Sequence, residues 1–146
     1  MKKLGLLVGV IALAIVVSSC DEKAKEYTGT YQGDMISAGK TIKSDAKIWI
    51  GGVTENQVYL DGLIPLTKQS DGVFTGSGEA LATFIKMFYS NEQLDKIENA
   101  NITATFSDDV LDMKMTYDVV VIGVPVSATA MSFNGKKISK ENKTQE

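Results

Sequence analysis

The sequence predicts a mainly β protein: an antiparallel meander that closes into a barrel or forms a strongly curved sheet, with a short helical insertion around residues 79–98. Three observations support this fold class. Apolar and polar residues alternate in several segments, turn-forming residues separate these segments at intervals of roughly ten to twelve residues, and one segment has helical spacing instead. If residues 1–19 are removed as a signal peptide, as the pattern at the N-terminus predicts, 127 residues remain. This length suffices for one domain that buries roughly two-thirds of its surface.

The first half of the domain carries a clear alternation. Apolar residues stand at every second position in two segments, Ala46, Ile48 and Ile50 and then Val58 and Leu60. Residues at i, i+2 and i+4 share one face of a strand, so these side chains should face the core. We expect turns at the glycine-containing positions between the strands, namely Gly39, Gly51-Gly52, Gly62 and Asp71-Gly72.

The second half contains the clearest hairpin signal. A turn at Ser107-Asp108-Asp109 separates two matching apolar faces, which are Ile102, Ala104 and Phe106 before it and Leu111, Met113, Met115 and Tyr117 after it. A last long strand is expected from Val126 to Phe133, with Pro125 at its start or edge. Asn134-Gly135 is the dipeptide preferred in tight hairpins, and it predicts a turn back along that strand.

Residues 79–98 break the alternation. Four apolar residues recur there at helical spacing: Leu81, Phe84, Ile85 and Phe88. This spacing predicts a helix over residues 79–89, and Asn91 would cap a second short helix ending near Glu98. We expect the insertion to plug one end of a barrel; the alternatives are that it covers an open sheet face or that residues 84–89 form a strand.

The N-terminus has the layout of a bacterial lipoprotein signal peptide. Lys2 and Lys3 precede an apolar run over residues 4–17, and Ser18-Ser19 lead into Cys20, the single cysteine of the chain. The run is shorter than the roughly 20 apolar residues of a membrane-spanning helix. We therefore expect Cys20 to be lipidated, with fatty acyl chains such as palmitate anchoring the protein in a membrane. A secretory signal without lipidation is the alternative.

The expected domain order is simple. Residues 1–19 form the removed signal peptide, residues 20–26 the lipidated cysteine and a charged tether, residues 27–136 a single β-barrel-like domain, and residues 137–146 a polar, disordered tail.

Composition narrows the function classes. All fifteen basic residues are lysine, and the mature chain would hold 13 lysines against 18 acidic residues, a net charge of −5. Arginine is the usual bidentate reader of phosphate and histidine the usual general base. Their absence from the sequence disfavours nucleic-acid binding and catalysis. We expect no enzymatic activity, no cofactor and no metal.

The start of the domain carries a family resemblance. The segment over residues 27–33, Tyr-Thr-Gly-Thr-Tyr-Gln-Gly, resembles the opening strand of the calycin-like small lipoproteins of Bacteroidetes, and Gly29-Thr30-Tyr31 is similar to the Gly-x-Trp start of lipocalins. The resemblance implies a small β-barrel with a cation stacked on the opening aromatic ring. Lipocalins use arginine for this, so Lys136 or Lys137 would have to take its place, or the feature is absent. Gly29 and Gly33 equally suit the sharp coiling of a first barrel strand.

The tether bears on localisation. Asp21 directly after the cysteine resembles an inner-membrane retention signal, whereas the acidic and lysine-rich residues 21–26 resemble the surface-export tether of Bacteroidetes lipoproteins. We expect a lipid-anchored protein of the cell envelope and favour the outer membrane.

Five residues are candidates for facing a ligand. Met113, Met115 and Tyr117 share one strand face, which would suit an apolar or flat ligand if it lined a cavity. An outward Trp49 beside Tyr59 would suit stacking on a sugar ring. The alternative is that these residues fill the core of a small barrel.

Other candidate sites have simpler explanations. Gly76-Ser77-Gly78 would suit an anion, but a loop and helix cap explain it better. Asp108, Asp109 and Asp112 fit a solvated turn better than a calcium site. The spacing of four further carboxylates does not indicate convergence on a glycosidic bond: Asp34, Asp61, Glu79 and Asp118.

The expected function is a non-catalytic binding module at the cell envelope, for a small apolar molecule, a glycan or a partner protein. The alternatives are a structural or inhibitory lipoprotein with a filled core, and a carboxylate-dependent hydrolase. The sequence does not indicate an oligomeric state.

Overall fold

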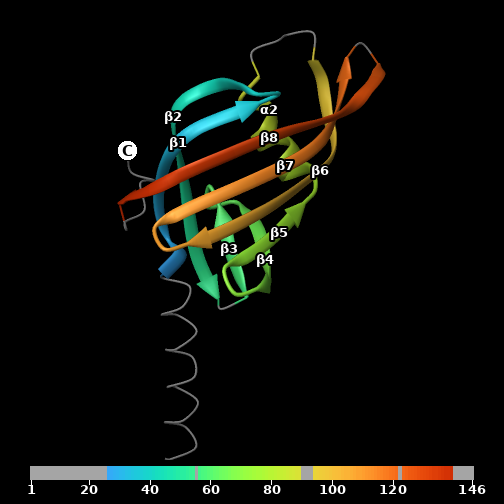
Figure 1. Ribbon diagram of the computed structural model, residues 1–146. Helices are drawn as coiled ribbons and strands as arrows, with labels where there is room; N and C mark the ends of the chain where they lie inside the picture. Colours follow the sequence, from blue (N-terminus) through green and yellow to red (C-terminus); the bar gives the residue numbers. More distant parts are fainter. Residues whose placement is uncertain (1–25, 55, 90–93, 122, 140–146) are drawn as a thin grey trace, which may run out of the picture.

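A closed β-barrel forms the body of the protein. The computed structural model describes residues 26–54, 56–89, 94–121 and 123–139. Eight antiparallel strands each pair with the next, and β8 pairs with β1 to close the sheet (Figure 1). The expected mainly β meander with a short helix is confirmed, and of the two expected forms the barrel is the one observed.

The elements follow one another with short connections. The strands are β1 (Gly29–Ser37), β2 (Lys40–Thr54), β3 (Gln57–Leu60), β4 (Ile64–Ser70), β5 (Val73–Ser77), β6 (Leu94–Ser107), β7 (Val110–Val121) and β8 (Val124–Ser139), and helix α2 (Glu79–Lys86) lies between β5 and β6. Because the strands alternate in direction, α2 and the β1–β2, β3–β4 and β7–β8 turns share one end of the barrel, which we call the helix end. The chain enters β1 at the opposite, N-terminal end (Figure 1).

Most expected turns are confirmed. Ala38 and Gly39 both have positive φ, at 53° and 77°, as a two-residue hairpin turn requires. Turns also occur at Gly62, at Asp71-Gly72 and at residues 108–109. The expected turn at Gly51-Gly52 is wrong, because both glycines lie inside β2 and pair with Tyr59 and Val58 of β3.

The predicted hairpin of the second half is confirmed in register. Phe106 pairs with Leu111, Ala104 with Met113, and Ile102 with Met115. All six side chains are buried. The alternation at Ala46, Ile48 and Ile50 likewise corresponds to buried positions of β2.

The expected turn at Asn134-Gly135 is wrong. β8 continues through both residues to Ser139, and Gly135 pairs with Gly33 of β1 and with Leu111 of β7. A Cβ on Gly135 would overlap the Phe133 ring, and one on Gly33 would overlap the carbonyl oxygen of Asn134. The glycines therefore allow β1 and β8 to approach closely where the barrel closes.

β8 also shifts the end of the domain. The strand runs three residues past the expected boundary at residue 136, and residues 140–146 lie outside the described part of the chain. Pro125 is the second residue of β8 and pairs only with Val120 of β7, since the pairing of β8 with β1 begins at Met131. The expectation of Pro125 near a strand start is confirmed.

The helical insertion is shorter than expected. α2 is present, but residues 94–98 belong to β6, where Ile97 pairs with Val119, so the second helix is wrong over these residues. Asn91 lies outside the described residues. The register of β6 shifts between Glu98 and Asn101, around Asn99 with φ 53°. A bulge adds a residue to a strand, so the buried Ile97 and Ala100 are three residues apart and imitate helical spacing.

Side chains close both ends of the barrel. At the helix end, α2 buries Leu81, Phe84 and Ile85 in the same core cluster as the strands, in agreement with the expected end plug. At the N-terminal end, the Tyr27 ring packs on Phe74 and Phe106, with centroid distances of 5.5 and 4.7 Å.

The opening aromatic ring has a cationic neighbour from β8. Lys137 Nζ lies 5.5 Å from the centroid of the Tyr31 ring. Of the two lysines considered for this position, Lys137 is the one that lies near the ring.

Candidate functional site

Three of the five candidate ligand residues lie inside the barrel. Met113 and Met115 are 0% exposed and Tyr117 is 1% exposed, and all three belong to the core cluster. Met113 pairs with Ala104 on one side and Phe133 on the other, and both of these are buried as well. These side chains therefore pack against other core side chains, as the core-filling alternative describes.

Tyr117 also connects the barrel wall to the segment after α2. Its hydroxyl forms a short hydrogen bond with the hydroxyl of Tyr89, and the two rings meet edge to face at 6.2 Å. Burial raises the pKa of Tyr117, and the hydrogen bond with Tyr89 raises it further. The hydroxyl pair therefore fastens the end of the helical insertion to β7.

Trp49 and Tyr59 lie on the outside of the barrel, each half-buried. The Trp49 ring lies close to Gly62 of the β3–β4 turn and also approaches Gly51. Tyr59 pairs with Gly51 of β2 and with Pro65 of β4. The two aromatic residues therefore occupy neighbouring outer positions of β2 and β3.

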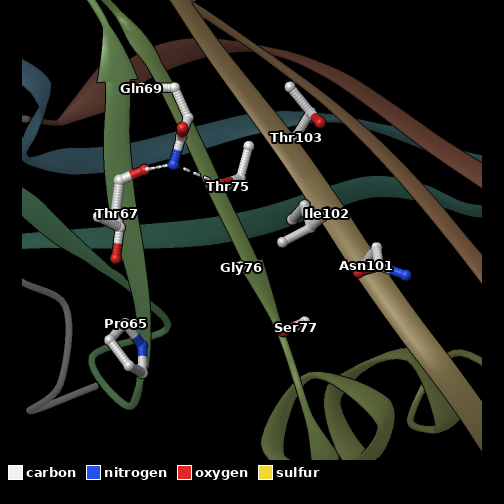
Figure 2. A pocket seen from close by; sticks show the side chains of 9 residues that line it. All are labelled: Pro65, Thr67, Gln69, Thr75, Gly76, Ser77, Asn101, Ile102 and Thr103. Atoms are coloured by element: carbon white, nitrogen blue, oxygen red, sulfur yellow. Dashed lines mark hydrogen bonds between the residues drawn. The ribbon is translucent and has the colours of Figure 1, made fainter.

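A hollow of about 560 Å³ opens on the barrel wall next to Tyr59, across β4, β5 and β6 (Figure 2). We call it the β4–β6 hollow. Its lining residues are Pro65, Thr67, Gln69, Thr75, Gly76, Ser77, Asn101, Ile102 and Thr103.

The β4–β6 hollow exists because β4 and β5 diverge. Their pairing stops at Thr67 and Thr75 on the side of the helix end, whereas β5 stays paired with β6 as far as Ser77 and Asn101. Figure 2 shows β5 leaning toward β6 as it separates from β4. The hollow is therefore a widening of the barrel wall.

Because Gly76 has no side chain, the Leu66 side chain can fill the space on the inner side of this widening. A Cβ on Gly76 would lie 2.6 Å from Leu66 Cδ2 and 3.2 Å from the carbonyl oxygen of Pro65. Leu66 is completely buried, so its side chain occupies the space that a larger residue at position 76 would need. The core thus closes the base of the hollow.

The walls of the β4–β6 hollow are polar and uncharged. Six of its side chains carry a hydroxyl or an amide group: Thr67, Gln69, Thr75, Ser77, Asn101 and Thr103. Gln69 Nε2 donates a hydrogen bond of 2.9 Å to Thr75 Oγ1 and one of 3.4 Å to the Thr67 carbonyl oxygen (Figure 2). No lysine, aspartate or glutamate is among the lining residues, all of which are described. Hydroxyl and amide groups both donate and accept hydrogen bonds, so the site suits a neutral polar ligand.

A second hollow of about 480 Å³ adjoins the first at Ser77 and Asn101. It lies between the start of α2 and β6, and we call it the helix hollow. Glu79, Lys96 and Glu98 line it, and Lys96 Nζ lies 3.5 Å from Glu98 Oε2. Glu79 at the start of α2 and Glu98 of β6 both line this hollow, and their negative charges disfavour the anion site considered for Gly76-Ser77-Gly78.

The other carboxylates considered from the sequence have structural roles or lie apart. Asp34 accepts the backbone N–H of Asp45 at 3.0 Å, and Asp118 accepts Asn99 Nδ2 at 2.8 Å. Asp112 accepts Asn134 Nδ2 at 3.3 Å across the β7–β8 pair. Asp61 lies in the β3–β4 turn, where burial raises the pKa of its carboxyl group. Of the four carboxylates weighed for hydrolysis, Glu79 is the one that lines a described hollow.

Within the described ranges, no three carboxylates are grouped so that they could hold a metal ion. Asp108 has φ 55° and lies with Asp109 in the β6–β7 turn. No helix in the described part of the chain is long and apolar enough to cross a membrane. Cys20 lies outside the described residues.

Sequence reasoning missed most of the β4–β6 hollow. Thr67, Thr75 and Thr103 stand at alternate polar positions of three strands, and such positions mark any solvent-facing sheet surface. Only the register shows that the three residues are directly paired across β4, β5 and β6.

Comparison with known protein families, with curated proteins and with solved structures finds no match to this chain.

Proposed function

We propose that this protein is a lipid-anchored, calycin-like binding protein of the cell envelope that holds its ligand on the outer wall of the barrel and catalyses no reaction. One contrast carries the proposal. The side chains that would line an internal cavity, Met113, Met115 and Tyr117, are at most 1% exposed, whereas the β4–β6 hollow is open and polar. A ligand therefore has more room on the wall than among these side chains.

The geometry is consistent with an anchor at Cys20. The chain enters β1 at the N-terminal end of the barrel, so a tether over residues 20–26 would attach there. The β4–β6 hollow begins beside the Thr67–Thr75 pair and extends toward the helix end, where the helix hollow adjoins it. An anchored barrel would thus present its hollows away from the lipid.

The anchor is tested by feeding cells an alkyne-bearing fatty acid and labelling the protein by click chemistry. We expect label on the wild type and none on Cys20→Ala. Equal labelling of the two proteins would exclude lipidation at Cys20. For the compartment we propose the outer membrane on the basis of the tether sequence, and membrane fractionation with protease treatment of intact cells tests it.

The binding site is tested by isolating the anchored protein from cells and identifying bound compounds by mass spectrometry. We expect a compound to co-purify with the wild-type protein. The Met113→Leu variant, which conserves core volume, should retain this compound, and the Thr75→Val variant should lose it. Loss from Met113→Leu with retention by Thr75→Val would move the site to the interior.

A structural or inhibitory envelope lipoprotein without a small ligand is the second candidate, because the packed core favours it as well. Finding no bound compound in either protein would favour this candidate. A carboxylate-dependent hydrolase has less support, since the four carboxylates weighed for it lie in β1, the β3–β4 turn, α2 and β7.

A further inference from the structure

We infer that the β4–β6 hollow binds a neutral saccharide through its hydroxyl and amide side chains. This inference rests on the proposed surface-binding function and names the chemical class of the ligand.

The lining of the β4–β6 hollow carries no charge. An anionic or cationic ligand gains most from an oppositely charged partner at its site. All nine residues that line the β4–β6 hollow are uncharged. The hollow therefore favours a ligand that is polar without being ionised.

Hydroxyl groups are arranged in rows across the hollow. Thr67, Thr75 and Thr103 are paired directly across β4, β5 and β6, and neighbouring strands lie about 4.8 Å apart. Their side chains form a row on the outer face, and Ser77 and Asn101 form a second paired row beside it. A sugar ring likewise carries several hydroxyl groups, each of which can donate and accept a hydrogen bond. The two rows thus match the hydrogen-bonding pattern of a saccharide.

The side chains of the hollow are partly held in place before a ligand binds. The hydroxyl-bearing residues stand on β-strands, and Gln69 holds the Thr75 hydroxyl with a 2.9 Å hydrogen bond. Side chains held in place before binding lose less conformational freedom when a ligand arrives. The volume of about 560 Å³ lies within the usual range of small-ligand sites, roughly 300–1,000 Å³.

The hollow also has an apolar lining residue, Pro65. Pro65 lines the hollow and is paired with Tyr59 of β3, which is half-buried on the same outer face. Sugars present C–H groups on the faces of their rings, and aromatic and proline rings pack against such groups. Pro65 is therefore the lining residue that we expect to pack against a sugar ring, with Tyr59 as its neighbour on β3.

An extended peptide fits the hollow less well. A peptide that adds to a sheet needs a free strand edge with alternating N–H and C=O groups. β5 is paired with β6 as far as Ser77, and Pro65 on the facing part of β4 has no N–H group.

The test uses the full chain purified from membranes in a detergent without a sugar headgroup. Maltotriose, cellotriose, xylotriose and tri-N-acetylchitotriose are titrated by calorimetry, beside a trigalacturonate and a trialanine peptide. We expect at least one neutral trisaccharide to bind, and Thr75→Val and Thr103→Val each to weaken its binding about fivefold. Thr105→Val is the matched control: it lies two residues from Thr103 on the same strand, outside the hollow, and should leave the affinity unchanged.

Three outcomes would overturn the inference. Binding of a neutral saccharide that is insensitive to both hollow variants would place it elsewhere. Binding of trigalacturonate or trialanine alone, weakened by Thr75→Val, would exclude the neutral ligand class but leave surface binding intact. If none of the probes bound, these saccharides would be excluded as ligands. The proposed function is tested separately: it would fail if the compound isolated from cells were lost from the Met113→Leu variant. Equal thermal unfolding midpoints of wild type and variants show that all are folded.

Discussion

The ammonium group of Lys137 lies 5.5 Å from the centre of the Tyr31 ring and donates a 2.7 Å hydrogen bond to the carbonyl oxygen of Glu26. Tyr31 in turn donates from its hydroxyl to the carbonyl oxygen of Tyr27 at 3.0 Å. The last strand of the barrel thus contacts both the first strand and the chain that leads into it. The N-terminal end of the barrel is therefore fastened by residues more than one hundred positions apart.

Replacing Lys137 should loosen this end. Lys137→Met keeps the apolar stem but removes the charge, and we expect a loss of about 1–2 kcal/mol in the free energy of unfolding. This corresponds to a fall of about 3–8 °C in the unfolding temperature. Thermal unfolding by circular dichroism measures it. Lys136→Met, on the neighbouring exposed residue, should change little, and an equal loss in both variants would refute a specific role for Lys137.

Gly135 should not tolerate a side chain. In Gly135→Ala the new Cβ would overlap the Phe133 ring and lie 3.2 Å from the backbone of Gln32, so we expect a loss of about 1–3 kcal/mol. Urea unfolding measures it. The control is Gly51→Ala, where the nearest atom to the new Cβ is Trp49 Cζ2 at 3.6 Å and the stability should stay nearly the same. If Gly51→Ala proved the more damaging variant, the close approach of β1 and β8 would lose its support.

Stability should fall in alkaline solution. Burial raises the pKa of Tyr31 and, together with the Tyr89 hydrogen bond, that of Tyr117. Both tyrosines therefore stay protonated in the folded protein above pH 10, where the unfolded chain loses those protons, so stability is complete below pH 10 and declines above it. Each of the two tyrosines lowers the free energy of unfolding by up to about 1.4 kcal/mol per pH unit above pH 10.

Urea unfolding between pH 9 and 11 measures this decline. Tyr117→Phe should make the decline above pH 10 shallower, because one of the two buried hydroxyl groups is gone. At pH 7 the same variant should cost about 1 kcal/mol, since it leaves the Tyr89 hydroxyl without this partner. An unchanged alkaline slope would show that the Tyr117 hydroxyl has no part in the decline.

The core position of Met115 also has a measurable consequence. Met115→Ala should lose about 2–5 kcal/mol, because the side chain is fully buried between Ile102 and Met131. Lys114→Ala, the exposed neighbour, should lose far less. An apolar fluorescent probe should not bind the wild type inside the barrel. If the wild type instead bound the probe strongly, and the Met115→Ala substitution changed that binding, the result would indicate an internal ligand site.

Local patterns predicted much of the fold correctly. The alternation at residues 46–50, the turn at residues 107–109 and the start of α2 depend on side-chain periodicity and turn chemistry within a few residues. The errors arose where a local signal had a distant cause. Gly51-Gly52 and Asn134-Gly135 read as turns, yet the first pair lies inside β2 in register with β3 and the second lies at the contact between β1 and β8.

The candidate site was predicted less well than the fold. Trp49 and Tyr59 were expected on the outer face and lie there, but Thr67, Gln69 and Thr103 were not singled out. Each is a common strand residue with nothing unusual beside it in the sequence. Their importance comes from their being gathered into one hollow.

The sequence by itself determined which residues of a regular strand share a face, because successive side chains of a strand point to opposite faces whatever its partners are. It also determined that the domain is stabilised by an apolar core without a disulfide, since it holds a single cysteine. Only the tertiary structure decided that β8 closes on β1, that Met113 and Met115 pack in the core, and that β4 and β5 separate beyond Thr67 and Thr75. Strand register around a closed barrel depends on all eight strands together, and no short stretch of sequence carries that information.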